Sequence, residues 1–273
     1  MGGNRAAAAE APVGLGTAAS FAVLGGTTVT NTGPSVISGD VGLSPGTAIT
    51  GFPPGIVNGT THATDAVAAQ AQIDTTTAYN DAAGRASTAT VSADLAGQTL
   101  VSGVYSGGTL GLTGTVTLDA QGDPNAVFIF QSASTLITAS SSVVALINGA
   151  SACNVFWQVG SSATLGTNST FVGTILALTS IAATTGVTID GRLLARNGEV
   201  TLDTNTITSS TCTTTPTTTT TIAPTTTAVL PTPTVPAGGI PKTGPPILPQ
   251  LRLACGLVLV GGVVMAVRRR NHT

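Results

Sequence analysis

Residues of the kinds that catalyse reactions are few in this chain, since only 7% of its 273 residues are charged. Hydrolysis or elimination by side chains needs clustered carboxylates, or a metal ion beside a basic residue. The one dense charged group in residues 12–212 consists of Asp190, Arg192, Arg196 and Glu199. Its position around a turn favours a structural ion pair. His62 has no partner pattern for a metal or a catalytic triad, so we predict no enzyme, no cofactor and no metal site.

The charge balance of the same region restricts its partners. Residues 12–212 contain three arginines, no lysine and ten acids, a formal balance of −7. A surface of that sign cannot follow a phosphate backbone, which excludes nucleic acid as a partner. Aromatic residues make up 3% of the chain, too few for a base-stacking platform.

Threonine-rich tetrapeptides recur at a regular spacing. They begin at Thr167, Thr185 and Thr204, and the segments GTILA at Gly173 and GRLLA at Gly191 align in the same frame. A repeat of this kind, with β-branched runs between Gly and Asn, is typical of a chain that winds into stacked coils.

The remaining pattern supplies the strands of such a winding. Short apolar runs separated by Gly, Pro, Asn and Asp fill residues 13–58, which predicts short strands and turns. Residues 110–118 alternate apolar and hydroxyl side chains, as half-buried strands do. Denser apolar runs at 126–131 and 154–159 predict strands buried on both faces, with Trp157 in the core.

One segment predicts a helix. Thr64 is a candidate N-cap, the Ala- and Gln-rich residues 66–83 follow, and Gly84 with Arg85 ends the segment. Its small side chains would let the helix lie close along one flank of the winding. A flank covered in this way cannot serve as a binding surface.

Composition divides the chain into four parts: a residual leader in 1–11, a folded body in 12–212, a Thr/Pro-rich stalk in 213–239 and a terminal segment in 240–273. The first part has the alanine cluster of a signal peptide without its apolar region, so a leader is absent or truncated here. The stalk has too little apolar surface to offset the entropy of ordering. It is expected to be extended and open to O-glycosylation, or a plain linker.

The terminal segment has the order of a surface anchor. Residues 240–244 read IPKTG, and an apolar run at 253–267 and three arginines follow. This order resembles the sorting signal of Gram-positive surface proteins, in which Leu usually stands where Ile240 is. The resemblance implies sortase cleavage between Thr243 and Gly244 and attachment to cell-wall peptidoglycan. The apolar run is shorter than the roughly 20 residues of a spanning helix, and a simple membrane anchor is the alternative; both place the body outside the cell.

The chain has three cysteines. Cys153 and Cys212 bracket the repeats and could pair in an oxidising compartment. Such a bridge would close a loop of about 60 residues and contribute roughly 4 kcal/mol. Two free thiols are the alternative, and Cys255 is expected to be an inert filler of the apolar run.

The body resembles the β-solenoid ice-binding protein family of bacteria, fungi and diatoms. The likeness is carried by LGTAASFAVLG at 15–25, ISGDVGL at 37–43, NVFWQVG at 154–160, LALTS at 176–180 and GRLLARN at 191–197. It implies an all-β-dominated fold, a right-handed discontinuous β-solenoid of triangular cross-section. The resemblance also implies that the first coils stand out of sequence order and that one long α-helix packs alongside.

The resemblance further implies an ice-binding face. Neighbouring coils lie about 4.8 Å apart, and alternate outward residues of a strand about 6.7 Å apart. Thr suits such a grid because its β-branch restricts χ1, and TGVT at Thr185 matches the family motif of Thr, a small residue, any residue, then Thr or Asn. We predict one exposed face formed by Thr138, Ser140, Thr167, Ser169, Thr185, Thr204 and Thr206, with Thr170 and Thr188 at its margin.

The same threonines are also compatible with a different arrangement and a different function. A one-residue slip would exchange the inner and outer faces, and Thr also suits any strand in a charge-poor solenoid. A surface adhesin for a glycan is the rival function, although the aromatics that a sugar site needs, Trp157, Tyr79 and Tyr105, are scattered. The prediction is therefore an extracellular, anchored, monomeric protein whose partners are ice and ordered water, the cell wall, and the membrane through residues 253–267.

Overall fold

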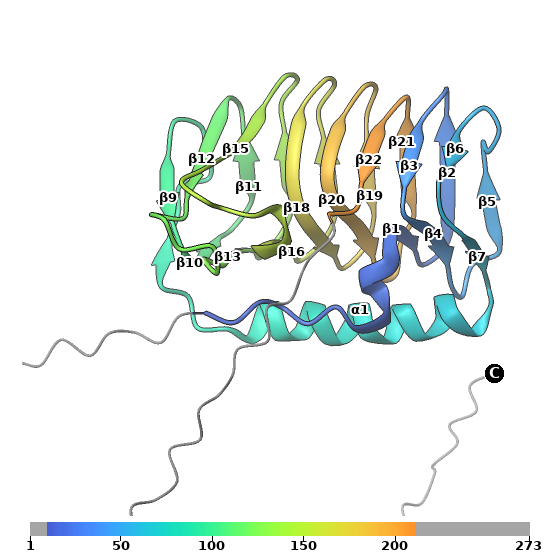
Figure 1. The fold of residues 1–273 in the computed structure, drawn as a ribbon, viewed down its shortest axis with the longest axis horizontal. Coiled ribbons are helices and arrows are strands. Elements are labelled where there is room, and N and C mark those ends of the chain that lie inside the picture. The colour runs from blue at the N-terminus through green and yellow to red at the C-terminus, as the bar shows by residue number, and fades with distance from the viewer. Residues whose placement is uncertain (1–9, 211–273) are drawn as a thin grey trace, which may run out of the picture. The chain divides into compact units, whose positions relative to one another are not determined.

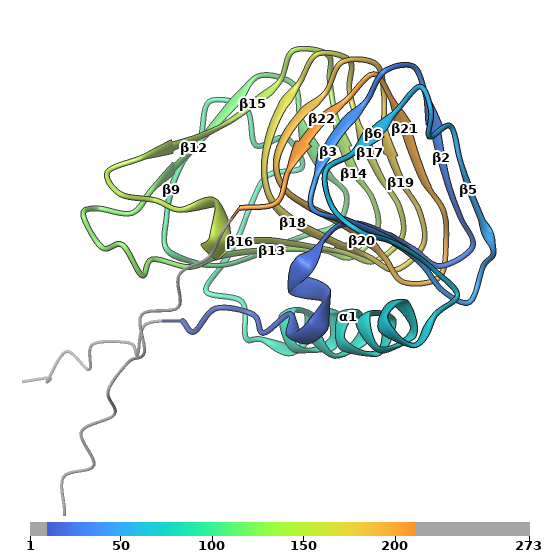
Figure 2. The same cartoon turned by 45° about the vertical axis from the view of Figure 1, so that its right-hand side comes forward.

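A computed structural model describes residues 10–210, which form a winding of short parallel strands with one long helix alongside (Figure 1). Successive strands of a coil belong to different sides of the winding, and each strand pairs with its counterpart in the neighbouring coil. The predicted β-solenoid with a packed helix is confirmed. Its strands form three faces, which we call the helix face, the open face and the loop face (Figure 2).

The strands of the three faces are as follows. The helix face consists of β8 (Ala89–Thr90), β10 (Gly103–Gly107), β13 (Phe128–Ser132), β16 (Val155–Val159), the second halves of β18 (Thr170–Ala177) and β20 (Thr188–Ala195), β1 (Phe21–Gly25), β4 (Asp40–Leu43) and β7 (Thr61–Ala63). The open face consists of β11 (Leu110–Leu112), β14 (Leu136–Thr138), β17 (Ala163–Leu165), β19 (Ile181–Ala183), β21 (Val200–Asp203), β2 (Thr28–Thr32) and β5 (Ala48–Thr50). The loop face consists of β9 (Thr99–Val101), β12 (Thr115–Asp119), β15 (Val143–Ile147), the first halves of β18 and β20, β22 (Thr206–Thr208), β3 (Val36–Ser38) and β6 (Ile56–Val57).

β18 and β20 bend from the loop face onto the helix face at a glycine. The two strands pair over their whole length, with Gly173 opposite Gly191 and Ala177 opposite Ala195, as the sequence alignment predicts. Gly191 has φ +155°, and a Cβ there would lie 1.9 Å from the carbonyl oxygen of Gly173. Only glycine can turn this corner without a clash.

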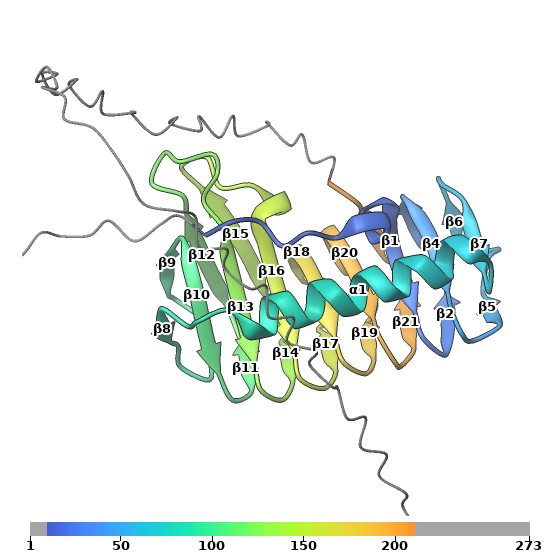
Figure 3. The same cartoon turned by 90° about the horizontal axis from the view of Figure 1, so that it is seen from below.

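The coils do not follow sequence order. β1 lies between β20 and β4, β22 pairs with β3, and β21 pairs with β2. The N-terminal coils therefore continue the stack beyond the last C-terminal coil, as the blue and orange strands of Figure 1 show. The helix then carries the chain back to the far end of the stack, where β8 begins (Figure 3). The predicted discontinuity is confirmed.

Helix α1 (Ala66–Gly84) has a length that suits this return. Its 19 residues extend about 28 Å, close to the six strand spacings of about 4.8 Å between β4 and β10. Its N-cap is Asp65, whose carboxylate accepts a hydrogen bond from the N–H of Ala68 at 2.8 Å, and this bond lowers the pKa of Asp65. The predicted Thr64 cap is wrong, because Thr64 has φ +57° and its hydroxyl bonds the carbonyl of Ala63.

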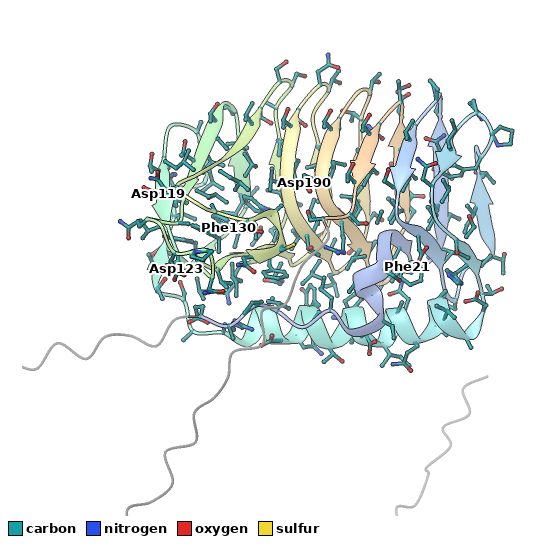
Figure 4. The ribbon with its side chains drawn as sticks, in the orientation of Figure 1. Phe21, Asp119, Asp123, Phe130 and Asp190 are labelled. Atoms are coloured by element: carbon teal, nitrogen blue, oxygen red, sulfur yellow. The ribbon has the colours of Figure 1, made fainter. Side chains whose placement is uncertain are left out.

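The interior is filled by apolar side chains and a stack of aromatic rings. Phe130 lies 4.0 Å from Trp157 between ring centroids, with Tyr105 and Phe171 on either side (Figure 4 labels Phe130). Trp157 is 1% exposed, and its indole N–H donates to the carbonyl of Val172 at 2.9 Å. The prediction of Trp157 as a core residue is confirmed.

Several predictions fall outside the described part of the chain. Cys153 is disulfide-bonded, but Cys212 lies beyond residue 210, so their pairing stays a prediction. Thr243, Gly244, the stalk and the apolar run at 253–267 also lie outside. Within residues 10–210, no helix is both long enough and apolar enough to cross a membrane.

Candidate functional site

The three faces differ first in what covers them. On the helix face, the outward side chains of Val104, Ile129 and Phe156 are buried against α1. A buried stripe of α1 that includes Ala71, Ala78 and Ala82 meets them. This apolar layer shows that α1 covers this side of the sheet, as the sequence predicts.

The loop face is covered in part. The short helix η2 (Ala152–Asn154) packs against β18 and β20, and Val172, in an outward position of β18, is only 8% exposed. Ser210 lies against the same face, where its hydroxyl donates to Asp190 at 2.5 Å. Covered and charged positions therefore interrupt this face.

The open face has no described element over it (Figure 2). Its strands are in unbroken parallel register, and their side chains alternate between buried and outward positions. The central outward column consists of Gly111, Ile137, Thr164, Ala182, Thr201, Thr30 and Thr50, paired one to the next. None of these seven residues is charged, and adjacent members are about 4.8 Å apart.

A repeated turn joins the open face to the loop face. Its second residue has a left-handed backbone in five successive coils: Ser141 (φ +57°), Asn168 (+56°), Gly186 (+74°), Thr204 (+53°) and Gly33 (+76°). The N–H of each of the first four donates to a carbonyl of the next coil, which sets these turns in register. In the first four of these turns the first residue faces outward, the third points inward and the fourth begins the loop face, while the turn at Gly33 is one residue longer. The four-residue motif therefore marks a turn whose side chains point in different directions from one residue to the next.

This turn decides where the predicted site residues lie. The first position holds Ser140, Thr167 and Thr185, which the structure brings together along the corner. The fourth position holds Thr170, Thr188 and Thr206, which pair directly with one another but on the loop face. The predicted residues therefore form two rows on different sides of a corner and do not share one face.

Two predicted residues point inward, which corrects their placement on an exposed face. Thr138 is 3% exposed, because Ile137 takes the outward position of β14 and the Thr138 hydroxyl accepts a hydrogen bond from Gly166 N–H at 2.9 Å. Ser169 is 1% exposed in the inward third position of its turn.

Thr204 lies in a different position from the predicted one. The register of Thr188 with Thr206 places Asp203, and not Thr204, in line with Thr185. Thr204 is the left-handed second residue of its turn, and it is exposed.

The sequence pattern did not reveal the central column of the open face. Its signal is present: Thr164 lies between Ala163 and Leu165, and Thr201 between Val200 and Leu202, each a single outward hydroxyl between two buried apolar residues. A three-residue strand contains only one such alternation, and a pattern of that length cannot be recognised in a chain rich in threonine.

The dense charged group does not form a site. Within residues 10–210 its members make no salt bridge with one another, so the predicted ion pair is wrong. Arg192, whose pKa is lowered by burial, donates to the carbonyls of Ala19 and Ser210, while Arg196 lies 4.8 Å from the ring centre of Tyr79. The aromatics that a glycan site would need are buried, with Trp157 at 1%, Tyr105 at 7% and Tyr79 at 9% exposure.

The amino-acid sequence of this chain is similar to those of known proteins. The family described as Ice-binding-like matches residues 23–208. A protein named ice-binding protein from Nostoc sp. (strain HG1) is 59% identical over 196 residues, which is 71% of this chain and 72% of that protein.

The chain is also similar to solved structures of ice-binding proteins. The crystal structure of an ice binding protein from an Antarctic biological consortium aligns with a TM-score of 0.73 at 52% identity, covering 74% of this chain and 93% of that one. The ice-binding protein of the Antarctic ascomycete Antarctomyces psychrotrophicus aligns with a TM-score of 0.72 at 46% identity, covering 74% and 100%.

Proposed function

Because the chain belongs to the ice-binding protein family, we propose that it binds ice through the open face and the first position of the corner turn. The observation that carries this proposal is the central column from Gly111 to Thr50, seven uncharged residues in register on a sheet that no described element covers. The loop face has a threonine row of its own, but η2 and Asp190 interrupt the surface beside it.

The physical basis is the order of the side chains. The repeat of about 4.8 Å between coils fixes their positions in one direction, and the pleat of each strand fixes them in the other. The β-branch of Thr restricts χ1, so its methyl and hydroxyl keep one orientation at little further entropic cost. Methyl groups disfavour bulk-like water and hydroxyls hold a few molecules in place, which supports an ice-like layer over the face. This role needs no catalytic group, and we propose none.

The proposal extends to location. A disulfide-bonded Cys153 supports an oxidising, extracellular compartment. The IPKTG segment with its apolar run and basic tail supports anchoring to peptidoglycan or to the membrane. Replacing Thr243 with Ala should move the protein from the wall fraction to the membrane or the medium. An unchanged wall fraction would remove the sortase part of the proposal.

The ice-binding part is tested by one bulky side chain at the centre of the open face. Thr201→Tyr keeps a strand-favouring residue but breaks the flat column, so it should abolish the shaping of ice crystals and the inhibition of recrystallisation. Thr77→Tyr, on the exposed side of α1, is the matched control and should keep full activity. Equal activity of both variants would move the binding surface away from the open face.

A further inference from the structure

Two carboxylates stand on the open face between β14 and β5, among residues that the structure describes in full. Both belong to one coil: Glu199 directly precedes β21, and Asp203 is its last residue. The sheet order β11-β14-β17-β19-β21-β2-β5 makes this coil the fifth of seven. The charges therefore lie inside the array and divide it into four strands on one side and two on the other.

Asp203 occupies a position that neighbouring coils give to a hydroxyl. It stands in the first position of the corner turn, in line with Thr185. Its carboxylate accepts a hydrogen bond from the hydroxyl of Thr185 at 2.5 Å and another from that of Thr204 at 3.0 Å. Both hydroxyl protons are therefore directed at Asp203 and not at water over the face.

The surroundings of both carboxylates belong to the open face. Asp203, Thr184, Thr201 and Thr32 line one shallow hollow. Glu199 is exposed at the other end of β21, where its carboxylate accepts a hydrogen bond from the hydroxyl of Thr28 at 3.4 Å. Thr201 thus lies between two negative charges.

A carboxylate holds its hydration shell tightly, with water hydrogens turned toward the oxygens, and removing part of that shell costs free energy. Water in such a shell cannot also take the positions of an ice lattice that continues over the neighbouring threonines. We propose that Glu199 and Asp203 limit the ice affinity of the open face, so that the protein binds ice less tightly than its threonine array would allow. This inference rests on the proposed function of that face.

The test neutralises both carboxylates without changing their shape. The full-length Glu199→Gln/Asp203→Asn variant keeps an oxygen acceptor for Thr28 and for one of the two hydroxyls of Thr185 and Thr204, and the NH2 of the new asparagine can donate to the oxygen of the other hydroxyl. It should inhibit ice recrystallisation at a roughly two- to threefold lower concentration than the unchanged chain, since less hydration free energy is lost on contact with ice. Asp203→Thr, which completes the hydroxyl row at the corner, should change activity in the same direction.

The matched control removes the same charge elsewhere. Asp119→Asn/Asp123→Asn changes two carboxylates near the far end of the stack, away from the open face (Figure 4). It should leave activity unchanged, which separates a local effect from one of net charge. Thermal unfolding of each variant shows whether the corner turn is intact, and Glu199→Gln alone tests the idea without touching that turn.

The outcomes separate this inference from the proposed function. If Thr201→Tyr abolishes activity while the neutralised variants stay equal to or below the unchanged chain, the open face binds ice and the carboxylates do not limit it. If neither Thr201→Tyr nor the neutralised variants change activity, the proposed function of this face fails as well. An increase in the Asp119/Asp123 control of the same size would also overturn the inference.

Discussion

The open face and the loop face carry similar residues but differ in what surrounds them. On the loop face, Thr170, Thr188 and Thr206 are direct partners in three consecutive coils. On the open face, Thr201, Thr30 and Thr50 are likewise direct partners, and Ala182 separates them from Thr164. By residue type alone the two faces have threonine runs of equal length. The open face differs because no element within residues 10–210 covers it and because its central column carries no charge, and for these two reasons we assign the proposed ice binding to it and not to the loop face.

The largest expected effect contrasts the two faces directly. A Thr164→Tyr/Thr201→Tyr variant should lose all activity toward ice, because two rings would hold the sheet away from a flat lattice. Thr170→Tyr/Thr188→Tyr places the same rings on the loop face, at exposed positions, and should keep most of the activity. Thermal hysteresis of both purified proteins measures the difference. The reverse order of activities would assign ice binding to the loop face.

The next contrast concerns stability. Gly191→Ala at the corner between the loop face and the helix face forces a Cβ to 1.9 Å from a backbone oxygen that cannot move freely. It should lower the free energy of unfolding by at least about 2 kcal/mol. Gly111→Ala on the open face brings a Cβ no closer than 3.1 Å to its nearest neighbour, the carbonyl oxygen of Ala93, and should cost much less. Denaturant unfolding of both variants checks this order, and equal losses would contradict it.

The fold was more predictable than the site. The features that were predicted correctly rest on signals that extend over many residues, such as glycine spacing and apolar runs. They include the alignment of Gly173 with Gly191, the helix over residues 66–83 and the buried Trp157. The site depends on the direction of single side chains in three-residue strands, where one turn residue resets the alternation. Thr204 shows the difficulty: a β-branched residue with φ +53° is uncommon, so the pattern alone does not reveal that Asp203 holds the outward position.

The smallest expected effect uses acid to compare the helix face with the open face. Asp74 on α1 accepts hydrogen bonds from the hydroxyl of Thr17 at 2.6 Å and from its N–H at 2.7 Å. Both bonds lower the pKa of Asp74 below its ordinary value of 3.8, and the bond from the Thr17 hydroxyl has the larger effect. A carboxylate whose pKa is lower in the folded than in the unfolded protein stabilises the fold at pH values above its unfolded-state pKa. This stabilisation is lost as the pH falls through the folded-state pKa.

Acidification below about pH 4 should therefore loosen the contact between η1 (Gly16–Ser20) and α1. The central column of the open face contains no group that titrates, so acid should not weaken its packing in this way. Hydrogen exchange should report faster opening of the amides of η1 and of the first half of α1 in acid, with the strands of the open face still protected. In Asp74→Asn the side chain can no longer lose a proton, so the pH dependence of the η1 amides should largely disappear, while the part that comes from the Asp65 cap of α1 should remain. Simultaneous loss of protection in both regions would mean that the helix and the open face unfold as one unit.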